Sequence, residues 1–241
     1  MSIARGRFIT LEGGEGAGKS TQARRIAEAL RGQGREVVLT REPGGSPRAE
    51  KIREAILSGL IAPLGPTAEA MMFTAARIDH LDHTIRPALA RGAWVVCDRF
   101  ADSTRAYQGA LGDLDPRFIR SLERIAIGPN IPDLTIMVDI PADVGMARAS
   151  QRRDGAPDRF EAEGPAFHEA LRRSFLEIAA SEPGRCVVVS GAQEPDVVAQ
   201  AIWSAVEARL LAAGEPAAKV GKPESTAPKR RRAAVSKTGA P

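Results

Sequence analysis

Residues 8–20 read FITLEGGEGAGKS, and this stretch decides the fold. Its last eight residues, Gly13 to Ser20, complete the pattern G-x-x-x-x-G-K-S. The residues before the pattern are typical of a strand, and the apolar spacing after it is typical of a helix. A glycine loop in this position turns backbone N–H groups toward phosphates, while lysine and serine supply a cation and a hydroxyl for Mg²⁺. The stretch therefore predicts a nucleoside triphosphate site rather than an ordinary glycine-rich turn.

The residues expected at the triphosphate are those of the loop and the first turn of the helix. They are Gly13, Gly14, Glu15, Gly16, Ala17, Gly18, Lys19, Ser20 and Thr21.

The composition predicts one domain followed by a basic tail. The chain has 241 residues, 43% of them hydrophobic, which is enough for one sizeable core. Residues 214–241 contain seven basic and two acidic residues, so the preceding 213 residues carry a net charge of −1. The tail has no aromatic residue and is rich in Pro, Ala, Gly and Lys. We expect a domain over 1–213 and a disordered tail over 214–241, whose contact with nucleic acid is possible but not favoured.

The chain shows no signal for a membrane or for disulfide bonds. No apolar run approaches the roughly 18 residues of a membrane span, and the N-terminal residues lack a hydrophobic signal segment. The two cysteines, Cys97 and Cys186, lie in or beside apolar runs, where buried thiols are expected. We therefore expect a soluble, cytoplasmic protein without a membrane partner.

Apolar, β-branched segments alternate with helical patterns along the chain. This order is typical of an α/β fold with three layers, in which a parallel sheet is covered by helices on both faces. Ligands of such sheets bind at the carboxyl ends of the strands, where Gly13, Arg41, Asp98 and Asp139 are expected. The five predicted strands cover residues 8–11, 35–40, 93–97, 134–138 and 186–189.

Five motifs, in order, resemble those of bacterial thymidylate kinases over about residues 7–211. They are LEGGEGAGKSTQ at 11–22, TREPGG at 40–45, FTAAR at 73–77, DRF with STRAYQG at 98–109, and DRFE at 158–161. The resemblance implies a P-loop NTPase fold of the nucleoside monophosphate kinase type, with a mobile lid. It also implies phosphoryl transfer from ATP, with Mg²⁺, to dTMP for dTTP and DNA precursor synthesis, in a homodimer.

The resemblance assigns the catalytic and phosphate-binding residues. Lys19, Asp98 and Arg99 are expected to be catalytic, and Ser20 with Asp98 to hold the metal. Arg41 and Arg99 would bind the monophosphate of the acceptor, because a guanidinium matches phosphate geometry. Asp98 needs no strong basicity, since the attacking phosphate oxygen is already anionic.

The resemblance also assigns the residues that contact the base and the sugar of the acceptor. Phe73 and Arg77 are four residues apart, so they share one face of a helix. The family stacks this phenylalanine on thymine and bonds the base edge with the arginine. By the same resemblance, Tyr107 crowds the 2′ position of the sugar and Gln108 lines the base pocket. The remaining expected acceptor-site residues are Glu12 and Ser103.

Residues 148–163 are the candidate lid. They combine a glycine and a proline with four arginines, a composition suited to a segment that closes over ATP. The arginines are Arg148, Arg152, Arg153 and Arg159. We expect Arg148 at the ATP site and either Arg152 or Arg153 as the transition-state arginine; the sequence leaves that choice open. Residues 191–194 follow the fifth strand, where such kinases place a loop against adenine.

The sequence leaves two alternative functions open. The first is a kinase of another nucleoside monophosphate on the same scaffold, which Phe73, Arg77 and Tyr107 would distinguish. The second is a P-loop ATPase whose basic tail binds nucleic acid, which the charge of −1 before the tail disfavours. His80 and His83 are expected to be surface or helix-packing residues rather than metal ligands, since no third ligand is evident.

Overall fold

The computed structural model describes residues 4–151 and 159–212. The expected tail over 214–241 lies outside the described residues, and so does the middle of the expected lid, with Arg152 and Arg153. The strands are β1 (Phe8–Glu12), β2 (Val37–Arg41), β3 (Trp94–Asp98), β4 (Leu134–Asp139) and β5 (Cys186–Ser190). The helices are α1 (Lys19–Gly32), α2 (Pro47–Leu57), α3 (Gly65–His80), α4 (Arg86–Ala90), α5 (Ala101–Thr104), α6 (Pro116–Ile127), α7 (Ala142–Gln151), α8 (Pro165–Ser181) and α9 (Pro195–Val206).

The five strands form one parallel sheet, as the sequence predicts, and the structure adds their order, β2-β3-β1-β4-β5. The central strand β1 is buried along its whole length, because neighbouring strands cover both edges and helices cover both faces. Leu11 pairs in register with Asp98, and Arg41 pairs with the same residue from the other side. The carboxyl ends of β1, β2 and β3 therefore meet, as expected.

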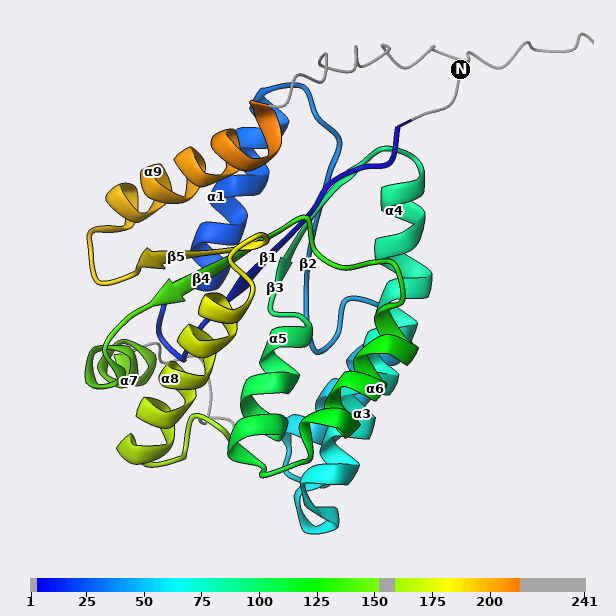
Figure 1. Ribbon diagram of the computed structural model, residues 1–241, viewed down its shortest axis with the longest axis vertical. Helices are drawn as coiled ribbons and strands as arrows, with labels where there is room; N and C mark the ends of the chain where they lie inside the picture. The colour runs from blue at the N-terminus through cyan, green and yellow to red at the C-terminus, as the bar shows by residue number, and fades with distance from the viewer. Residues whose placement is uncertain (1–3, 152–158, 213–241) are drawn as a thin grey trace, which may run out of the picture.

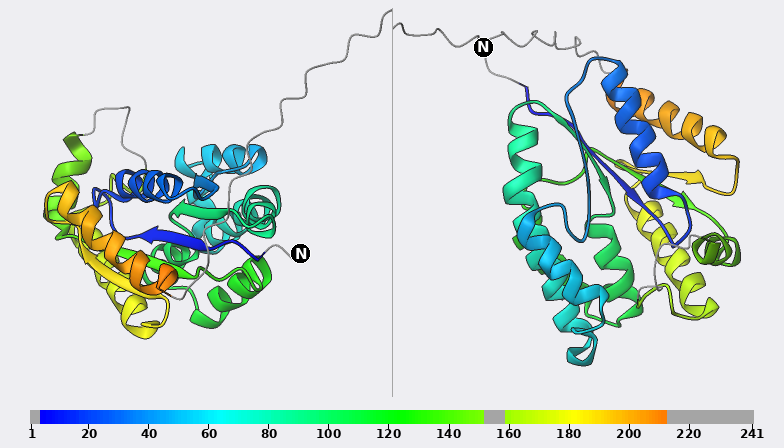
Figure 2. Two further views of the ribbon diagram at one scale, coloured as in Figure 1. Left: turned by 90° about the horizontal axis from the view of Figure 1, so that it is seen from above. Right: turned by 180° about the vertical axis from the view of Figure 1, so that it is seen from behind.

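Alternation along the strands divides the core between two helical layers. Ile9 and Leu11 face the layer of α1 and α9, which lie side by side (Figures 1 and 2). Phe8 faces the opposite layer, where it packs with α4 and with Phe100 at the start of α5. Glu12 belongs to this second face by its register, which directs its side chain toward α5.

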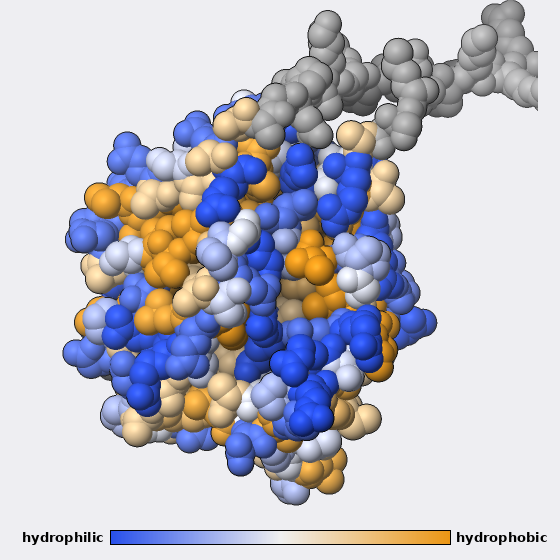
Figure 3. Space-filling view, in the orientation of Figure 1, coloured by the Kyte–Doolittle hydropathy of each residue, from blue (hydrophilic) through white to orange (hydrophobic). Residues whose placement is uncertain are grey.

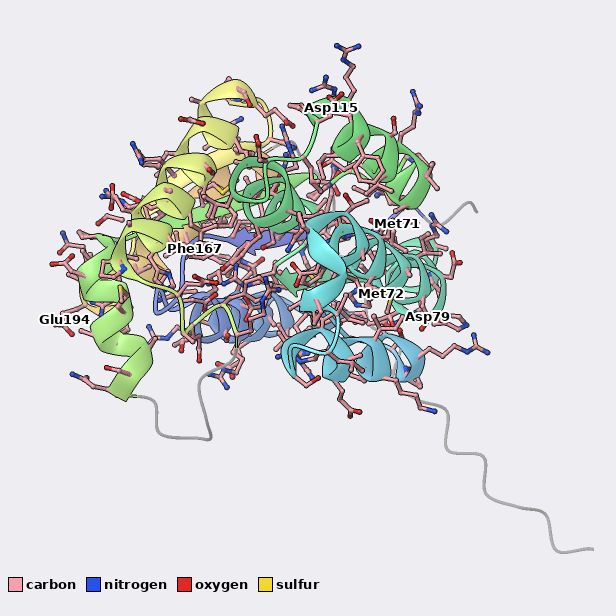
Figure 4. All side chains as sticks on the ribbon, turned by 90° about the horizontal axis from the view of Figure 1, so that it is seen from below. Met71, Met72, Asp79, Asp115, Phe167 and Glu194 are labelled. Carbon is pink, nitrogen blue, oxygen red and sulfur yellow. The ribbon has the colours of Figure 1, made fainter. Side chains whose placement is uncertain are left out.

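Helix α3 carries residues expected at the site and is tied to its neighbours on two sides. It packs against α2 and α6 and continues through a π-helical turn, Leu81–Ile85, into α4. The helical segment from Gly65 to Ala90 therefore contains one local irregularity. Met71 faces outward, whereas Met72 packs inward against an apolar cluster with Phe73 (Figure 4).

The visible surface in Figure 3 mixes hydrophilic residues with separate hydrophobic patches. Both cysteines are buried and free, as expected. Among the described residues, no single helix is long and apolar enough to cross a membrane. One bent pair of helical segments, Pro47–Leu57 with Ala62–Ala90, meets that test by length and composition alone.

Candidate active site

The glycine loop between β1 and α1 uses backbone conformations that side chains rarely adopt. Gly13, Gly16 and Gly18 have φ values of +134°, +69° and +87°. A Cβ atom on Gly16 would lie 2.0 Å from the carbonyl oxygen of Gly145. The loop thus has the close turns that let backbone N–H groups approach phosphate oxygens at a helix N-terminus.

Lys19 begins α1, and its ammonium group lies inside the loop. Only 7% of the residue is exposed, and Nζ donates to the carbonyl oxygen of Gly14 at 2.6 Å. Burial lowers the pKa of Lys19 from 10.5 to about 8, and the positive charge of Arg99 adds to the shift. A bound polyphosphate would favour the charged form again, because opposite charge raises the pKa of an ammonium group.

Ser20 and Asp98 supply oxygen donors suited to a magnesium ion. The Ser20 hydroxyl donates to Oδ2 of Asp98, and Oδ1 of Asp98 is buried with no hydrogen-bond partner among the described residues. No group of three or more His, Cys, Asp or Glu side chains in the described ranges could hold a metal by itself. Mg²⁺ commonly takes one or two protein oxygens and completes its shell with phosphates and water. The donor set therefore fits Mg²⁺ that binds together with a nucleotide.

A cavity of about 230 Å³ runs from the glycine loop along the carboxyl ends of the strands. We call it the central cavity. Its wall includes groups expected for the triphosphate, the acceptor phosphate and the acceptor base. The lining residues are Glu15, Gly16, Gly18, Lys19, Ser20, Arg41, Glu42, Pro43, Arg53, Leu57, Phe73, Asp98, Arg99, Ser103, Thr104, Tyr107, Gln108, Phe160 and Glu161.

Arg99 crosses the central cavity from the end of β3. Its φ of +68° is unusual for a residue with a side chain and indicates local strain at this turn. Nη1 donates to the carbonyl oxygen of Gly13 at 3.1 Å and to Oγ of Ser103 at 3.2 Å, and Nη2 donates to Glu15. Burial acts to lower the pKa of Arg99, but Glu15 and other acidic neighbours outweigh it and raise that pKa.

Glu15 is expected at the triphosphate, but its side chain points toward Arg99 and Tyr107. Its carboxylate pairs with Arg99 and accepts a hydrogen bond from the Tyr107 hydroxyl at 2.8 Å. Its partners are 84 and 92 positions away in the chain, which is why the loop pattern alone could not predict this orientation. Glu15 therefore places a negative charge beside the arginine expected to bind phosphate.

Glu12 lies behind the cavity wall rather than on it. The residue is fully buried, with Oε1 accepting from the Phe100 backbone N–H at 2.7 Å and Oε2 from the Ser103 hydroxyl at 2.7 Å. It therefore fixes the start of α5 and acts on the cavity through Ser103. Burial raises the pKa of Glu12 from 4.5 to about 7, and the negative charge of Asp102 adds to the shift.

This shift predicts a pH dependence of stability. Between pH 4.5 and 7 the folded protein binds a proton at Glu12 that the unfolded chain releases, so stability falls as pH rises through this window. Glu12→Gln removes the titration. We expect the variant to gain up to about 3 kcal/mol relative to the parent protein between pH 5 and pH 8. Urea unfolding at both pH values measures the change, and a constant difference would contradict the expectation.

Aromatic residues form one part of the wall of the central cavity. Phe73 and Tyr107 both approach the ring of Phe160, with centroid distances of 6.3 Å and 5.2 Å. Gln108 lines the same wall and is 2% exposed. Phe160 received no role from the sequence, although it lies within the DRFE motif. The resulting slot has the flat, apolar sides that a nucleobase requires.

Arg77, expected at the edge of the base, is 3% exposed and bonds to residues of the cavity wall. Nε donates to Oε2 of Glu42 at 2.7 Å, and Nη2 donates to the Phe100 carbonyl oxygen and to Oγ1 of Thr104 at 3.0 Å and 3.1 Å. Glu42 and Thr104 do line the cavity. Within the described part of the chain, Nη1 of Arg77 makes no hydrogen bond, which leaves its donors available.

Two further arginines reach the central cavity. Arg41 lines it as expected, but its side chain is 53% exposed and pairs with Glu50 at 3.0 Å. Arg53 from α2 also lines it and donates to the Pro43 carbonyl oxygen at 2.8 Å. The sequence did not predict Arg53 as a site residue. The only signal for it was its place on the helix that follows the TREPGG motif.

The described parts of the expected lid lie at its two ends. Arg148 belongs to α7, not to a loop, and donates to the Gly191 carbonyl oxygen at 2.8 Å. That contact brings it to the segment expected against adenine, outside the central cavity. Arg159 pairs with Glu69 of α3, and its guanidinium lies over the Phe160 ring at 4.9 Å.

Comparisons with known proteins agree with this geometry. The family model for thymidylate kinase matches residues 11–202. The chain is 53% identical over 211 residues to the thymidylate kinase of Bradyrhizobium diazoefficiens, covering 87% of this chain and 92% of that protein. It is 54% identical over 214 residues to that of Nitrobacter hamburgensis, covering 88% and 93%. The solved thymidylate kinase of Ehrlichia chaffeensis is similar with a TM-score of 0.69 and 30% identity, covering 84% of this chain and 99% of that one.

Proposed function

Because the chain belongs to the thymidylate kinase family, which transfers the γ-phosphoryl group of ATP to dTMP, we propose that the central cavity is where dTMP meets ATP. The observation that supports this site is the union, in one cavity, of Lys19 and Ser20 with three arginines and an aromatic slot. The family match favours this reaction over a P-loop ATPase whose tail binds nucleic acid, and over a kinase of another monophosphate.

In the proposed arrangement, an oxygen of the dTMP phosphate attacks the γ-phosphorus of ATP. The new P–O bond forms as the bond to the ADP oxygen breaks, so the residues mainly align two anions and neutralise charge. Arg99 and Arg53 hold the acceptor phosphate, and Lys19 contacts the phosphates of ATP. Mg²⁺ bound near Ser20 and Asp98 would neutralise charge on the phosphate oxygens. Arg41, which is more exposed, supports the acceptor phosphate from the rim.

At the other end of the cavity, Phe73 stacks on thymine and Gln108 closes the base pocket. Arg77 directs Nη1 toward O4 of the base, since Nε and Nη2 already bind protein oxygens. Thymine presents an acceptor at this position, whereas cytosine presents an amino donor. Tyr107 crowds the 2′ position of the sugar, and Ser103 and Glu12 fix the wall beside it.

Phe73→Leu tests the orientation of the acceptor. Loss of base–aromatic stacking costs about 1–3 kcal/mol, so KM for dTMP should rise roughly 5- to 150-fold. KM for ATP should not change, because Phe73 belongs to α3 and not to the glycine loop or α1, where the triphosphate is expected. Steady-state ADP release with each substrate varied in turn measures both constants.

Met71→Leu is a matched control for this variant, since Met71 lies on the outer side of the same helix. It should leave both constants unchanged. Equal KM values for dTMP in Phe73→Leu and the parent protein would contradict the placement of the base at Phe73.

The proposal includes a lid and a dimer. Residues 148–163 close over ATP, with Arg148 near the adenine and either Arg152 or Arg153 at the transferring group. A homodimer would use α3 and α6, which pack together and expose Met71 and Ile125 at 55% and 70%. The proposed location is the cytoplasm, with no membrane partner, and nucleic-acid contact by residues 214–241 is not part of the function.

A further inference from the structure

We propose that His80 is a positioning residue for the base of dTMP, acting through Glu42 on Arg77. The inference rests on the proposed role of Arg77. His80 is fully buried, and Glu42 and Arg77 are 5% and 3% exposed. Glu42 lines the central cavity and joins the other two side chains in a chain of hydrogen bonds. Nothing in the reaction itself requires a histidine there.

The hydrogen bonds fix the direction of this chain. Oε2 of Glu42 accepts from Nε of Arg77 at 2.7 Å, and Oε1 faces Nδ1 of His80 at 3.0 Å. An ionised carboxylate only accepts, so Nδ1 of His80 must carry the proton. In the neutral ring, Nε2 then accepts from the Thr40 hydroxyl at 2.7 Å. Each group therefore has one role, and rotation of His80 would release Glu42.

The same helix face anchors the loop that follows β2. Ser46 donates to Asp79 at 2.6 Å, and Thr84 donates to the Gly45 carbonyl oxygen at 2.7 Å. A Cβ atom on Gly45 would lie 2.3 Å from Nε2 of His80, so the ring packs directly on the loop backbone. His80 thus contacts both the backbone of this loop at Gly45 and the carboxylate of Glu42 at its start.

The consequence concerns the choice of base. Two nitrogens of Arg77 bind protein oxygens, and only Nη1 is left for O4 of thymine. If Glu42 rotates away from Nε, the guanidinium loses one of its two fixed edges and Nη1 is no longer aimed. His80 therefore contributes to the preference for an acceptor at this base position without touching the substrate.

Two substitutions of His80 separate the effect of losing its hydrogen bond to Glu42 from the effect of losing the imidazole ring. The amide nitrogen of asparagine can take the place of Nδ1, so His80→Asn keeps a donor for Glu42. The longer glutamine reaches the place of Nε2, so His80→Gln keeps contact with Thr40 and loses Glu42. A small misplacement of a substrate-binding group costs up to about 100-fold, so we expect His80→Gln to lower kcat/KM for dTMP by about 10-fold or more.

The decisive measurement is the ratio of kcat/KM for dTMP to that for dCMP. We expect His80→Gln to lower this ratio, His80→Asn to retain most of it, and KM for ATP to stay unchanged in both. His83→Gln is the matched control, since His83 is exposed on the same turn and bonds to Asp79. Thermal melting should show similar losses for both His80 variants, so stability alone would not separate them.

The variant Arg77→Gln separates a failure of the role inferred for His80 from a failure of the role proposed for Arg77. If Arg77→Gln keeps the dTMP/dCMP ratio, the proposed role of Arg77 fails. If Arg77→Gln loses the dTMP/dCMP ratio while His80→Gln keeps it, only the proposed role of His80 is overturned. Equal losses of this ratio in His80→Gln and His80→Asn also overturn the role of His80. Should His80→Gln not fold, Thr40→Val frees the ring at its other nitrogen, and an unchanged ratio there overturns the inference.

Discussion

We expect Arg99→Ala to lower kcat for phosphoryl transfer to dTMP by about 10²- to 10³-fold, with little change in the affinity for ATP. The guanidinium spans the cavity between Gly13 and Ser103 and stays charged at every working pH. In the proposed arrangement it is therefore in position, before substrate binds, beside the charge that develops during transfer. Steady-state turnover and equilibrium binding of ATP to the variant measure the two effects separately.

The loss has two parts, because Arg99 also neutralises Glu15. Alanine at position 99 removes the phosphate donor and also the positive charge that offsets Glu15 beside an anionic substrate. Adding Glu15→Gln to Arg99→Ala should therefore recover part of the lost affinity for dTMP, since the repulsion disappears while the missing donor does not return. The double variant would show no recovery if Glu15 pointed away from the acceptor.

Arg120→Ala provides a control with the same change of charge. Arg120 is exposed on α6 and does not line the central cavity. Its turnover should match that of the parent protein. Near-normal turnover in Arg99→Ala would remove Arg99 from the acceptor site, and a selective loss of ATP affinity would move it to the other substrate.

Local patterns predict the framework well because its determinants are close together in the sequence. The strand, the glycine loop and the start of α1 lie within residues 8–20, and their order follows from backbone chemistry. The same holds for the ends of β2 and β3, where Arg41 and Asp98 become neighbours once the sheet is parallel. Because strands and helices alternate along the chain, few sheet topologies are compatible with the sequence.

The orientation of side chains within the site could not be predicted in this way. Glu15 turns toward Arg99, and Arg77 is held behind the wall by Glu42, 35 residues earlier in the chain. Phe160 closes the aromatic slot from a segment that gives no local sign of its neighbours. These positions depend on contacts between distant segments, and a motif specifies the residue type without specifying which neighbour it binds.

The second large effect is expected at Asp98. Asp98→Asn keeps the size of the side chain and an acceptor for the Ser20 hydroxyl but removes the negative charge. Metal-assisted charge stabilisation is worth several kcal/mol, so kcat should fall by about 10²-fold or more. The Mg²⁺ concentration for half-maximal activity should rise as well. A titration of activity with MgCl₂ at saturating ATP and dTMP measures both changes.

The metal dependence separates Asp98 from a residue that only supports the strand. Asp139 ends the neighbouring strand β4 and binds Arg172 at 2.7 Å and 3.0 Å, outside the central cavity. Asp139→Asn should leave the Mg²⁺ requirement unchanged even if it lowers stability. Oδ1 of Asp98 is buried with no hydrogen-bond partner in the described ranges, which leaves this oxygen available to a metal ion. An unchanged Mg²⁺ requirement in Asp98→Asn would contradict the proposed role of Asp98 at the metal.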